Sequence, residues 1–230
     1  MNRSGRGRFI TFEGGEGAGK STQLRQLAAA LRARGIDVVI TREPGGSPRA
    51  EEIRTYLLAG HARDLGATAE AVLFSAARLD HIDRLIRPAL ERGAWVLCDR
   101  FADSTRAYQG ALGDVDTGLI DALERVVVGD MRPDLTIVLD IAAPVGLARA
   151  AARRGADAAP DRFEAEDVGF HTRLRSAFQA IAEQHADRCV VVDADQEETA
   201  VAAAIAAIVE QRFEELVHPH EPVIGLRRNG

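Results

Sequence analysis

The stretch Gly14–Ser21 has the residue types and spacing that phosphate binding needs. It reads GGEGAGKS and fits G-x-x-x-x-G-K-[ST], the pattern of a phosphate-binding loop. Its glycines let the backbone curl so that N–H groups point at phosphate oxygens, and a helix behind it adds the positive end of its dipole. Lys20 supplies a mobile positive charge for the outer phosphates, and the Ser21 hydroxyl can hold Mg²⁺. The stretch therefore predicts binding of a nucleoside triphosphate.

The residues around this stretch support the prediction. The apolar run Phe9–Phe12 predicts a short strand before it, and Thr22–Arg34 predicts a helix after it, which is the order that such a loop requires. Of the 29 lysines and arginines, 28 are arginine, so Lys20 is the only lysine of the chain. A glycine-rich turn that fits the pattern by chance is the alternative, and the flanking strand and helix disfavour it.

Five apolar runs predict the strands that must position these residues. They are rich in β-branched residues and continuously apolar, which is typical of strands buried on both faces of a parallel sheet. The runs are Phe9–Glu13, Val38–Thr41, Trp95–Asp99, Leu135–Asp140 and Cys189–Asp193. Helices are predicted at Thr22–Arg34, Arg49–Ala59, Thr68–Arg92, Thr117–Val128, Pro144–Arg154, Glu166–Ala186 and Glu197–Leu216. This alternation predicts a doubly wound α/β fold, in which ligands bind beyond the carboxyl ends of the strands.

Length and composition indicate one globular domain. The chain has 230 residues, of which 46% are hydrophobic and 28% charged, so it can bury a core and still carry insertions. We expect residues 1–217 to form this domain and residues 218–230 to form a flexible tail. A net charge of −6 and a pI near 5.6 argue against general binding of nucleic acid or of an anionic membrane.

The sequence also indicates a cytosolic protein. No apolar run approaches the ~18 residues of a membrane helix, and the N-terminal MNRSGRGRF lacks the apolar core of a signal peptide. Cys98 and Cys189 each fall inside a predicted buried strand, which favours core residues over a disulfide or a metal site.

Several polar residues fall at the predicted strand ends: Glu13, Arg42, Asp99, Arg100 and Asp140. Arg42 is followed by Glu43 and a Pro-Gly-Gly turn, which can project its guanidinium into the cleft toward a phosphate or carboxylate. A surface pair between Arg42 and Glu43 remains the alternative.

Phe74 and Arg78 are spaced i, i+4 in a predicted helix, so they share one helix face. An aromatic plane beside a guanidinium suits the stacking of a nucleobase. In the alternative interpretation, Phe74 belongs to the core and Arg78 is a solvated charge.

The third predicted strand ends in Asp99-Arg100. Asp99 is expected opposite Ser21, where it would act through water on Mg²⁺, and Arg100 would point at a phosphate. No helix is predicted in the segment that follows, which offers groups able to read a pyrimidine edge: Ser104, Thr105, Tyr108 and Gln109.

Residues 153–164 join two predicted helices and are rich in small residues, with arginines on both flanks. This composition suits a mobile lid that brings Arg153, Arg154 or Arg162 over phosphates and excludes water. An ordinary solvated loop would carry arginines as well and is the alternative.

Together these segments resemble the thymidylate kinases, within the P-loop nucleoside monophosphate kinases. The matching motifs are TFEGGEGAGKST, TREPGG, LFSAAR, DRFADSTRAYQG, RPDL with LTIVLD, and DRFE. They follow in the family's order from Phe9 to about Glu166, and the combination of TREPGG with DRFADSTRAYQG is more specific than the loop alone. The resemblance implies transfer of the ATP γ-phosphoryl group to dTMP with Mg²⁺. It also implies a homodimer and a three-layer α/β/α fold with a five-stranded parallel sheet of order 2-3-1-4-5.

The resemblance further implies roles for single residues. Arg42 and Arg100 would bind the dTMP phosphate, Glu16 would face the deoxyribose 3′-hydroxyl, and Glu164 would lie near the sugar. Phe74 would stack on thymine and Arg78 would reach its exocyclic oxygen, while Ser104, Thr105, Tyr108 and Gln109 would complete the nucleoside pocket. Contacts to ATP would come from Gly14, Gly15, Glu16, Gly17, Ala18, Gly19, Lys20, Ser21 and Thr22, and the Mg²⁺ side from Ser21 and Asp99.

One segment departs from part of the family. Some members carry a catalytic arginine inside the phosphate-binding loop, where this chain has Glu16-Gly17-Ala18. The resemblance then implies that lid arginines supply the charge, as in the family's bacterial branch. The residues expected to act on the transferring phosphoryl group are Lys20, Arg42, Arg100, Arg154 and Arg162.

Three rival functions are distinguishable. A kinase for another acceptor, such as dUMP or a nucleoside, would use the same motifs. A GTPase needs a base-reading N-K-x-D motif, which a chain with lysine only at position 20 cannot contain. A catalytically inactive regulatory module would not need the full set of arginines.

Overall fold

The computed structural model describes residues 6–154 and 162–213. Its five strands are β1 (Phe9–Gly14), β2 (Val38–Arg42), β3 (Trp95–Asp99), β4 (Leu135–Asp140) and β5 (Cys189–Asp193). The long helices are α1 (Lys20–Ala33), α2 (Pro48–Leu58), α3 (Gly66–His81), α6 (Thr117–Val127), α7 (Ala143–Arg154), α8 (Val168–Gln184) and α9 (Glu198–Arg212). Shorter helical segments are η1 (Arg63–Leu65), η2 (Ile82–Ile86), α4 (Arg87–Glu91), α5 (Ala102–Thr105) and η3 (Arg106–Ala111).

The strands form one parallel sheet in the order β2-β3-β1-β4-β5, which confirms the predicted topology. In register, Phe12 of β1 and Arg42 of β2 both lie opposite Asp99 of β3. Each strand is followed by a helix that returns the chain, so all the carboxyl ends meet at one edge of the sheet. The polar residues predicted at strand ends are therefore brought together.

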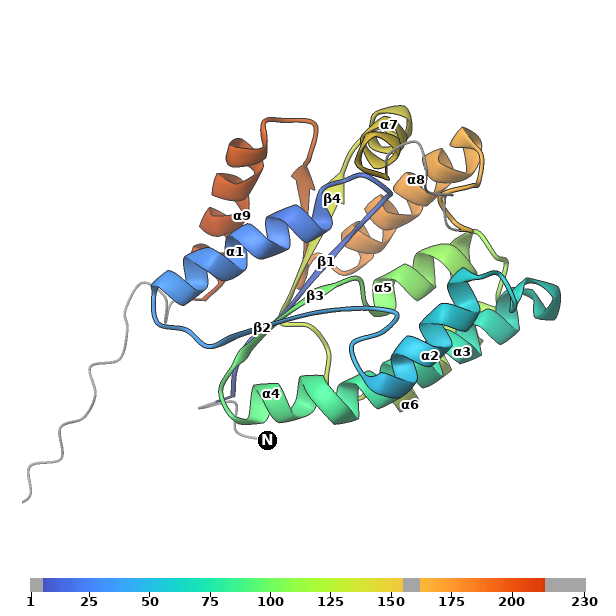
Figure 1. Cartoon of the computed structure of the whole chain (residues 1–230), viewed down its shortest axis with the longest axis horizontal. Coiled ribbons are helices and arrows are strands. Elements are labelled where there is room, and N and C mark those ends of the chain that lie inside the picture. Colours follow the sequence, from blue (N-terminus) through green and yellow to red (C-terminus); the bar gives the residue numbers. More distant parts are fainter. Residues whose placement is uncertain (1–5, 155–161, 214–230) are drawn as a thin grey trace, which may run out of the picture.

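Helices cover both faces of the sheet, as Figure 1 shows. On one face, α1 and α9 pack against each other and against alternate strand residues such as Phe12, Leu97 and Ile137. On the other face lie the helical segments from α3 to α6 together with α8, which cover Phe9, Val96 and their neighbours. Alternation along β3 thus points Asp99 toward α1, while Cys98 points into the opposite layer.

The prediction that strands are buried on both faces is correct only at the centre of the sheet. β1 is buried at every residue, and β3 and β4 are buried at all but their last residue. The outer strands β2 and β5 instead expose alternate side chains, including Ile40 and Val191. An edge strand has a neighbour on one side only, so helices cover it less completely.

Two helical predictions need correction. The predicted helix Thr68–Arg92 consists of α3, a π-helical turn at η2, and α4. Pro88 in α4 has no N–H and would collide with a carbonyl one turn earlier, so the wider turn accommodates it. The segment after Asp99 is helical over α5 and η3, although no helix was predicted there. The i, i+4 spacing of Ser104 with Tyr108 and of Thr105 with Gln109 is the sequence feature that could have indicated this helix.

The ends of the remaining helices lie within two residues of the predicted bounds, except that the last helix, α9, ends at Arg212, four residues before its predicted end. Residues 214–216 of the last predicted helix, most of the proposed lid, and the tail at 218–230 lie outside the described residues. None of the helices in 6–154 and 162–213 is both long and apolar enough to cross a membrane.

Candidate active site

The phosphate-binding loop connects β1 directly to α1. The helix begins at Lys20, two residues before the predicted start, so Ser21 lies in its first turn. Gly14 and Gly17 have φ angles of 129° and 67°. A Cβ on Gly17 would overlap the carbonyl oxygen of Gly146 in α7. The loop backbone therefore rests directly on α7, and only glycine fits that contact.

Lys20 folds back over the loop that precedes it. Its Nζ donates to the carbonyl oxygen of Gly15 at 2.7 Å and to that of Gly14 at 3.1 Å. Burial lowers the pKa of Lys20, and the nearby guanidinium of Arg100 lowers it further. The ammonium group is thus held at the loop by backbone oxygens, where phosphate oxygens would compete for it.

Ser21 and Asp99 meet between α1 and β3, as the sequence predicted. The Ser21 hydroxyl donates to Asp99 Oδ2 at 2.5 Å. The pair brings together a hydroxyl and a carboxylate, both hard oxygen ligands of the kind that Mg²⁺ prefers. No group of three or more His, Cys, Asp or Glu side chains suited to a metal ion occurs in the described ranges. A Mg²⁺ ion that is shared with phosphates and water needs only one or two protein ligands.

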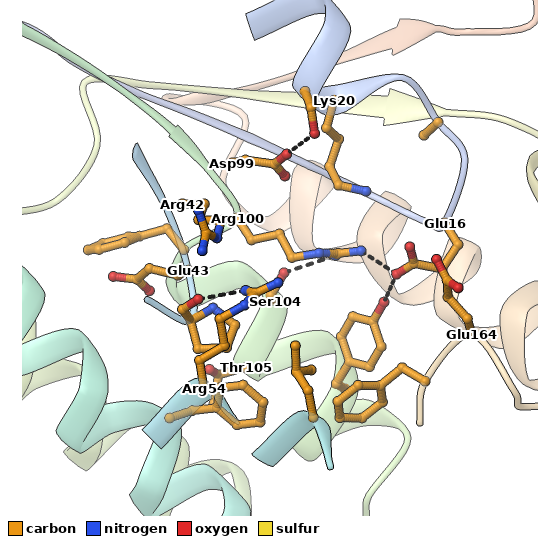
Figure 2. Close-up of a pocket in the computed structure, with 18 of the residues that line it drawn as sticks. Glu16, Lys20, Arg42, Glu43, Arg54, Asp99, Arg100, Ser104, Thr105 and Glu164 are labelled. Atoms are coloured by element: carbon orange, nitrogen blue, oxygen red, sulfur yellow. Dashed lines mark hydrogen bonds and ion pairs between the residues drawn. The ribbon is translucent and has the colours of Figure 1, made fainter. Parts of the chain in front are cut away.

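A cavity of about 440 Å³ lies beyond the carboxyl ends of β1, β2 and β3. It is lined on one side by the phosphate-binding loop and on the other by α3 and the helical segment after Asp99 (Figure 2). The predicted residues that line it are Glu16, Gly17, Ala18, Gly19, Lys20, Ser21, Thr22, Arg42, Phe74, Arg78, Asp99, Arg100, Ser104, Thr105, Tyr108, Gln109, Arg153 and Glu164. Those outside the lining are Gly14, Gly15, Arg154 and Arg162.

Arg100 crosses the middle of this cavity. Its backbone has a φ of 69°, in the left-handed region, which turns the chain sharply out of β3. Its guanidinium donates to Glu16 Oε1 at 2.6 Å, to the Gly14 carbonyl at 3.1 Å and to Ser104 Oγ at 3.3 Å. Figure 2 shows it between Glu16 and Ser104. Tyr108 completes the group, with its hydroxyl 3.2 Å from Glu16 Oε1.

The charges of this group depend on one another. Burial by itself would raise the pKa of Glu16, but Arg100 and Lys20 outweigh burial and lower it to about 2. Burial alone would likewise lower the pKa of Arg100, and Tyr108 and Glu16 raise it instead. Glu16 is therefore an ionised acceptor inside a loop whose amides suit anions. The adjacent cations Arg100 and Lys20, together with the Tyr108 hydroxyl, stabilise its negative charge.

Glu13 is a functional candidate whose role the sequence did not predict. It is fully buried, and its carboxylate accepts from the backbone N–H of Phe101 at 2.7 Å and from Ser104 Oγ at 2.6 Å. These bonds hold the sharp turn that contains Arg100. Burial raises the pKa of Glu13 to about 7, and the nearby Asp103 adds to the rise.

The opposite shifts of Glu13 and Glu16 predict that their combined contribution to the free energy of unfolding is largest near pH 4.5, their shared ordinary pKa. Between pH 4.5 and 7, folded protein holds the Glu13 proton more tightly than unfolded chain, so the free energy of unfolding falls as pH rises. Below pH 4.5, protonation of Glu16 removes its stabilising pair, so this free energy falls as pH decreases toward 2. Urea unfolding at stepwise pH measures both effects.

In that experiment, Glu13→Gln is expected to flatten the profile between pH 4.5 and 7, because it removes the titrating group. Glu210→Gln, at an exposed pair with Arg34, serves as the matched control. A Glu13→Gln profile that still falls across this window would contradict the assignment.

The acceptor side of the cavity is aromatic. Phe163 packs edge-on against Tyr108, with ring centroids 5.0 Å apart, and lies 6.4 Å from the ring of Phe74. Phe74 is half-buried and lines the cavity, so it is not a simple core residue. Phe163 belongs to the DRFE motif, but no role had been predicted for it.

Arg78 is buried, which excludes the alternative of a solvated charge. Its Nε donates to Glu43 Oε2 at 2.7 Å, and its Nη2 donates to the Phe101 carbonyl and the Thr105 hydroxyl, each at 3.1 Å. The guanidinium therefore lies in the cavity wall with a fixed orientation.

Arg42 pairs with Glu51 of α2 and not with Glu43, so the alternative surface pair is wrong. Both oxygens of Glu51 accept from Arg42 Nη2, at 3.0 and 3.1 Å. Arg54 of α2 also lines the cavity and donates to the Pro44 carbonyl at 2.6 Å. Arg54 was not predicted from the sequence. The sequence feature that could have indicated Arg54 is the Pro-Gly-Gly turn, which directs α2 back toward the strand ends.

The arginines of the proposed lid contact carboxylates in this structure. Arg154 donates to Glu164 Oε2 at 2.6 Å, and Arg153 lies 3.7 Å from the other oxygen of Glu164. Arg162 pairs with the buried Glu70 and stacks on Phe163, 4.9 Å from its centroid. Residues 155–161 between them lie outside the described ranges.

Comparison with known proteins gives a consistent result. A family model described as thymidylate kinase matches residues 12–205. The thymidylate kinase of Nitrobacter winogradskyi is 60% identical over 209 residues, which are 91% of this chain and 90% of the relative. The thymidylate kinase of Rhodopseudomonas palustris is 59% identical over 214 residues, which are 93% of each chain. A crystal structure of thymidylate kinase from Ehrlichia chaffeensis matches with a TM-score of 0.70 and 34% identity, over 89% of this chain and 99% of that one.

Proposed function

Because the chain belongs to the thymidylate kinase family and phosphorylates dTMP to dTDP with ATP, we propose that the reaction takes place in the cavity between the phosphate-binding loop and α3. One observation carries this proposal. A single cavity is lined by the loop with Lys20 on one side and by Phe74 and Arg78 on the other. Donor phosphates and an acceptor base would thus bind in one cavity, as direct phosphoryl transfer requires.

The donor half combines backbone N–H groups, the N-terminus of α1 and Lys20. Lys20 would exchange its loop carbonyls for phosphate oxygens when ATP binds. The Ser21 hydroxyl and the Asp99 carboxylate would hold Mg²⁺, Ser21 directly and Asp99 through water, and the ion would neutralise charge on the donor phosphates. Transfer between two polyanions is limited by positioning and charge, and these residues would supply both.

The acceptor half would hold dTMP along its whole length. Arg42 and Arg100 would bind its phosphate, and Glu16 would accept from the 3′-hydroxyl of its sugar, near Glu164. Phe74 would stack on thymine, and Arg78 would donate to an exocyclic oxygen. The remaining polar groups of the pocket would be Ser104, Thr105, Tyr108 and Gln109. Support comes from their shared position in the cavity lining.

We further propose that residues 153–164 close over the phosphates and that Arg154 or Arg162 then leaves its glutamate to contact the transferring group. This would place the two arginines, now outside the lining, within reach of the reaction. Residues 1–217 would act as one kinase domain, with residues 218–230 as a tail.

A homodimer packed through helices is proposed as the working form in the cytosol. Apolar side chains on the outer faces of α3 and α6, among them Val72, Leu79 and the strongly exposed Val126, would suit such an interface. Light scattering after size-exclusion chromatography reports the mass directly.

A substrate panel tests the proposed function. ADP production is measured with dTMP, dUMP, dCMP, AMP and thymidine, each with ATP in the presence of Mg²⁺ and after its removal by chelation. We expect the highest kcat/KM with dTMP and loss of turnover without Mg²⁺, because the metal offsets phosphate charge. Activity on thymidine but not on dTMP, or ATP turnover indifferent to every monophosphate, would overturn the proposal.

A further inference from the structure

A second polar cluster, distinct from the phosphate groups, lies beneath the acceptor side of the cavity. It consists of Thr41 on β2, Glu43 just after it, and Arg78 and His81 one turn apart on α3. All are buried, and His81 has no exposed surface at all. Such groups are costly to bury unless each one is hydrogen-bonded. Neither Thr41 nor His81 is among the residues proposed to contact the nucleotides.

The four side chains form one continuous series of hydrogen bonds. Thr41 Oγ1 lies 2.7 Å from His81 Nε2, and His81 Nδ1 lies 2.9 Å from Glu43 Oε1. The second oxygen of Glu43 accepts from Arg78 Nε at 2.7 Å. The series thus runs from the sheet edge, through His81 and Glu43, to a residue of the cavity wall.

The chemistry of these groups fixes one proton position. A carboxylate paired with a guanidinium only accepts hydrogen bonds, so His81 must carry its proton on Nδ1. Nε2 accepts from the Thr41 hydroxyl if the ring is neutral and donates to it if the ring is protonated, so the contact between them is satisfied in either state. The Nδ1 proton is therefore the one that the network requires, and it satisfies the Glu43 oxygen that faces His81. A Cβ on Gly46 would overlap both the ring of His81 and the Thr41 hydroxyl, so the loop after β2 closes tightly over this contact.

The same contacts determine which part of Arg78 faces the cavity. Nε is used by Glu43, and both protons of Nη2 are used by the Phe101 carbonyl and the Thr105 hydroxyl. Among the described residues, Nη1 has no protein acceptor, and Arg78 lines the cavity. Nη1 is thus the guanidinium nitrogen available to a ligand, and it can only donate. A base with an acceptor at that position fits, whereas one with an amino group does not.

We propose that His81 is a positioning residue for base selection. It fixes Glu43 through the Nδ1 proton, and Glu43 in turn holds the guanidinium of Arg78 at the angle that offers Nη1 to a carbonyl oxygen of the base. Without His81, one oxygen of Glu43 loses its partner, and the carboxylate can rotate and take Arg78 with it. This inference rests on the proposed role of Arg78 at the exocyclic oxygen of thymine.

The test compares His81→Leu with His81→Asn, whose amide nitrogen can stand near Nδ1. In His81→Leu, we expect about a tenfold loss of the preference for dTMP over dCMP in kcat/KM, since hydrogen bonds to charged groups are worth this much. The KM for dTMP should rise while the KM for ATP stays within about twofold. His81→Asn should recover most of the preference, because it restores the donor to Glu43.

Three further variants separate the possible outcomes. Thr11→Val removes a buried hydroxyl pair with Thr136 inside the sheet, and it should lower thermal stability without changing base preference. Arg78→Ala should lose the preference by itself, and adding His81→Leu to it should cost little more, because the two act in series. Thr41→Val removes the other anchor of His81 and should weaken the preference more mildly. If His81→Leu does not fold, the base preference of Thr41→Val is measured in its place.

An unchanged preference in Arg78→Ala would overturn the proposed role of Arg78, and with it this inference. A reduced preference in Arg78→Ala, with His81→Leu behaving like Thr11→Val, would overturn the positioning role alone. Wild-type preference in Thr41→Val, where His81→Leu is unfolded, would have the same meaning.

Discussion

Replacing Lys20 with alanine is expected to lower kcat/KM for dTMP by ~10²-fold or more, since a preorganised charge at the transferring phosphates has an effect of that size. Lys20 is the only lysine of the chain, and its Nζ is already held at the loop by the carbonyls of Gly14 and Gly15. Alanine removes the charge and leaves these oxygens facing the phosphates. Most of the loss should fall on kcat, because charge stabilisation increases as the phosphoryl group moves.

The measurement is coupled ADP production with both substrates varied. Arg34→Ala, at an exposed ion pair on the far end of α1, is the control for general loss of a positive charge. The thermal melting curve of each variant establishes that it is folded. A folded Lys20→Ala protein with nearly unchanged kcat/KM would exclude the assigned role.

Arg100→Ala is expected to lower kcat/KM for dTMP by ~10²-fold or more as well, because two anions must approach each other around this guanidinium. The variant also leaves Glu16 without its closest cation, so a carboxylate would face the acceptor phosphate. The KM for dTMP should rise together with the fall in kcat.

A backbone control sharpens this experiment. Arg100 has a φ of 69°, which alanine tolerates poorly and glycine tolerates well. Comparing Arg100→Ala with Arg100→Gly therefore separates loss of the guanidinium from strain in the turn. Equal losses assign the effect to the guanidinium. Recovery of activity in Arg100→Gly would instead assign it to the backbone.

The fold was largely accessible from the sequence because its central strands are buried on both faces. Their continuous apolar runs identify them, and the phosphate-binding loop orients the first strand and helix. The segment from Ala102 to Ala111 was missed as a helix because its polar residues face the cavity, so its pattern is not that of a helix packed on a core. The π-helical turn before Pro88 could not be predicted either. A proline indicates that the helix is irregular there, but not whether it kinks, breaks or widens into a π-helical turn.

The site was predictable at the level of which residues gather, and less so at the level of which residues pair. Register along parallel strands brings Arg42 and Asp99 to one edge, so strand ends alone are informative. Pairing depends on helix directions that the sequence does not specify. Arg42 therefore meets Glu51 from α2, while the adjacent Glu43 turns inward to Arg78.

The arginines of the cavity and lid share an arrangement with a consequence for how ligands bind. Each of five arginines is matched to a glutamate, in the pairs Arg42–Glu51, Arg78–Glu43, Arg100–Glu16, Arg154–Glu164 and Arg162–Glu70. Each glutamate therefore offsets the charge of its arginine and reduces the repulsion among these cations. For the pairs whose arginine turns to a phosphate, binding is an exchange of one anion for another. Separating the arginine from its glutamate offsets part of the free energy of phosphate binding. The nucleotide is therefore bound less tightly, which favours the release of product at the end of each cycle.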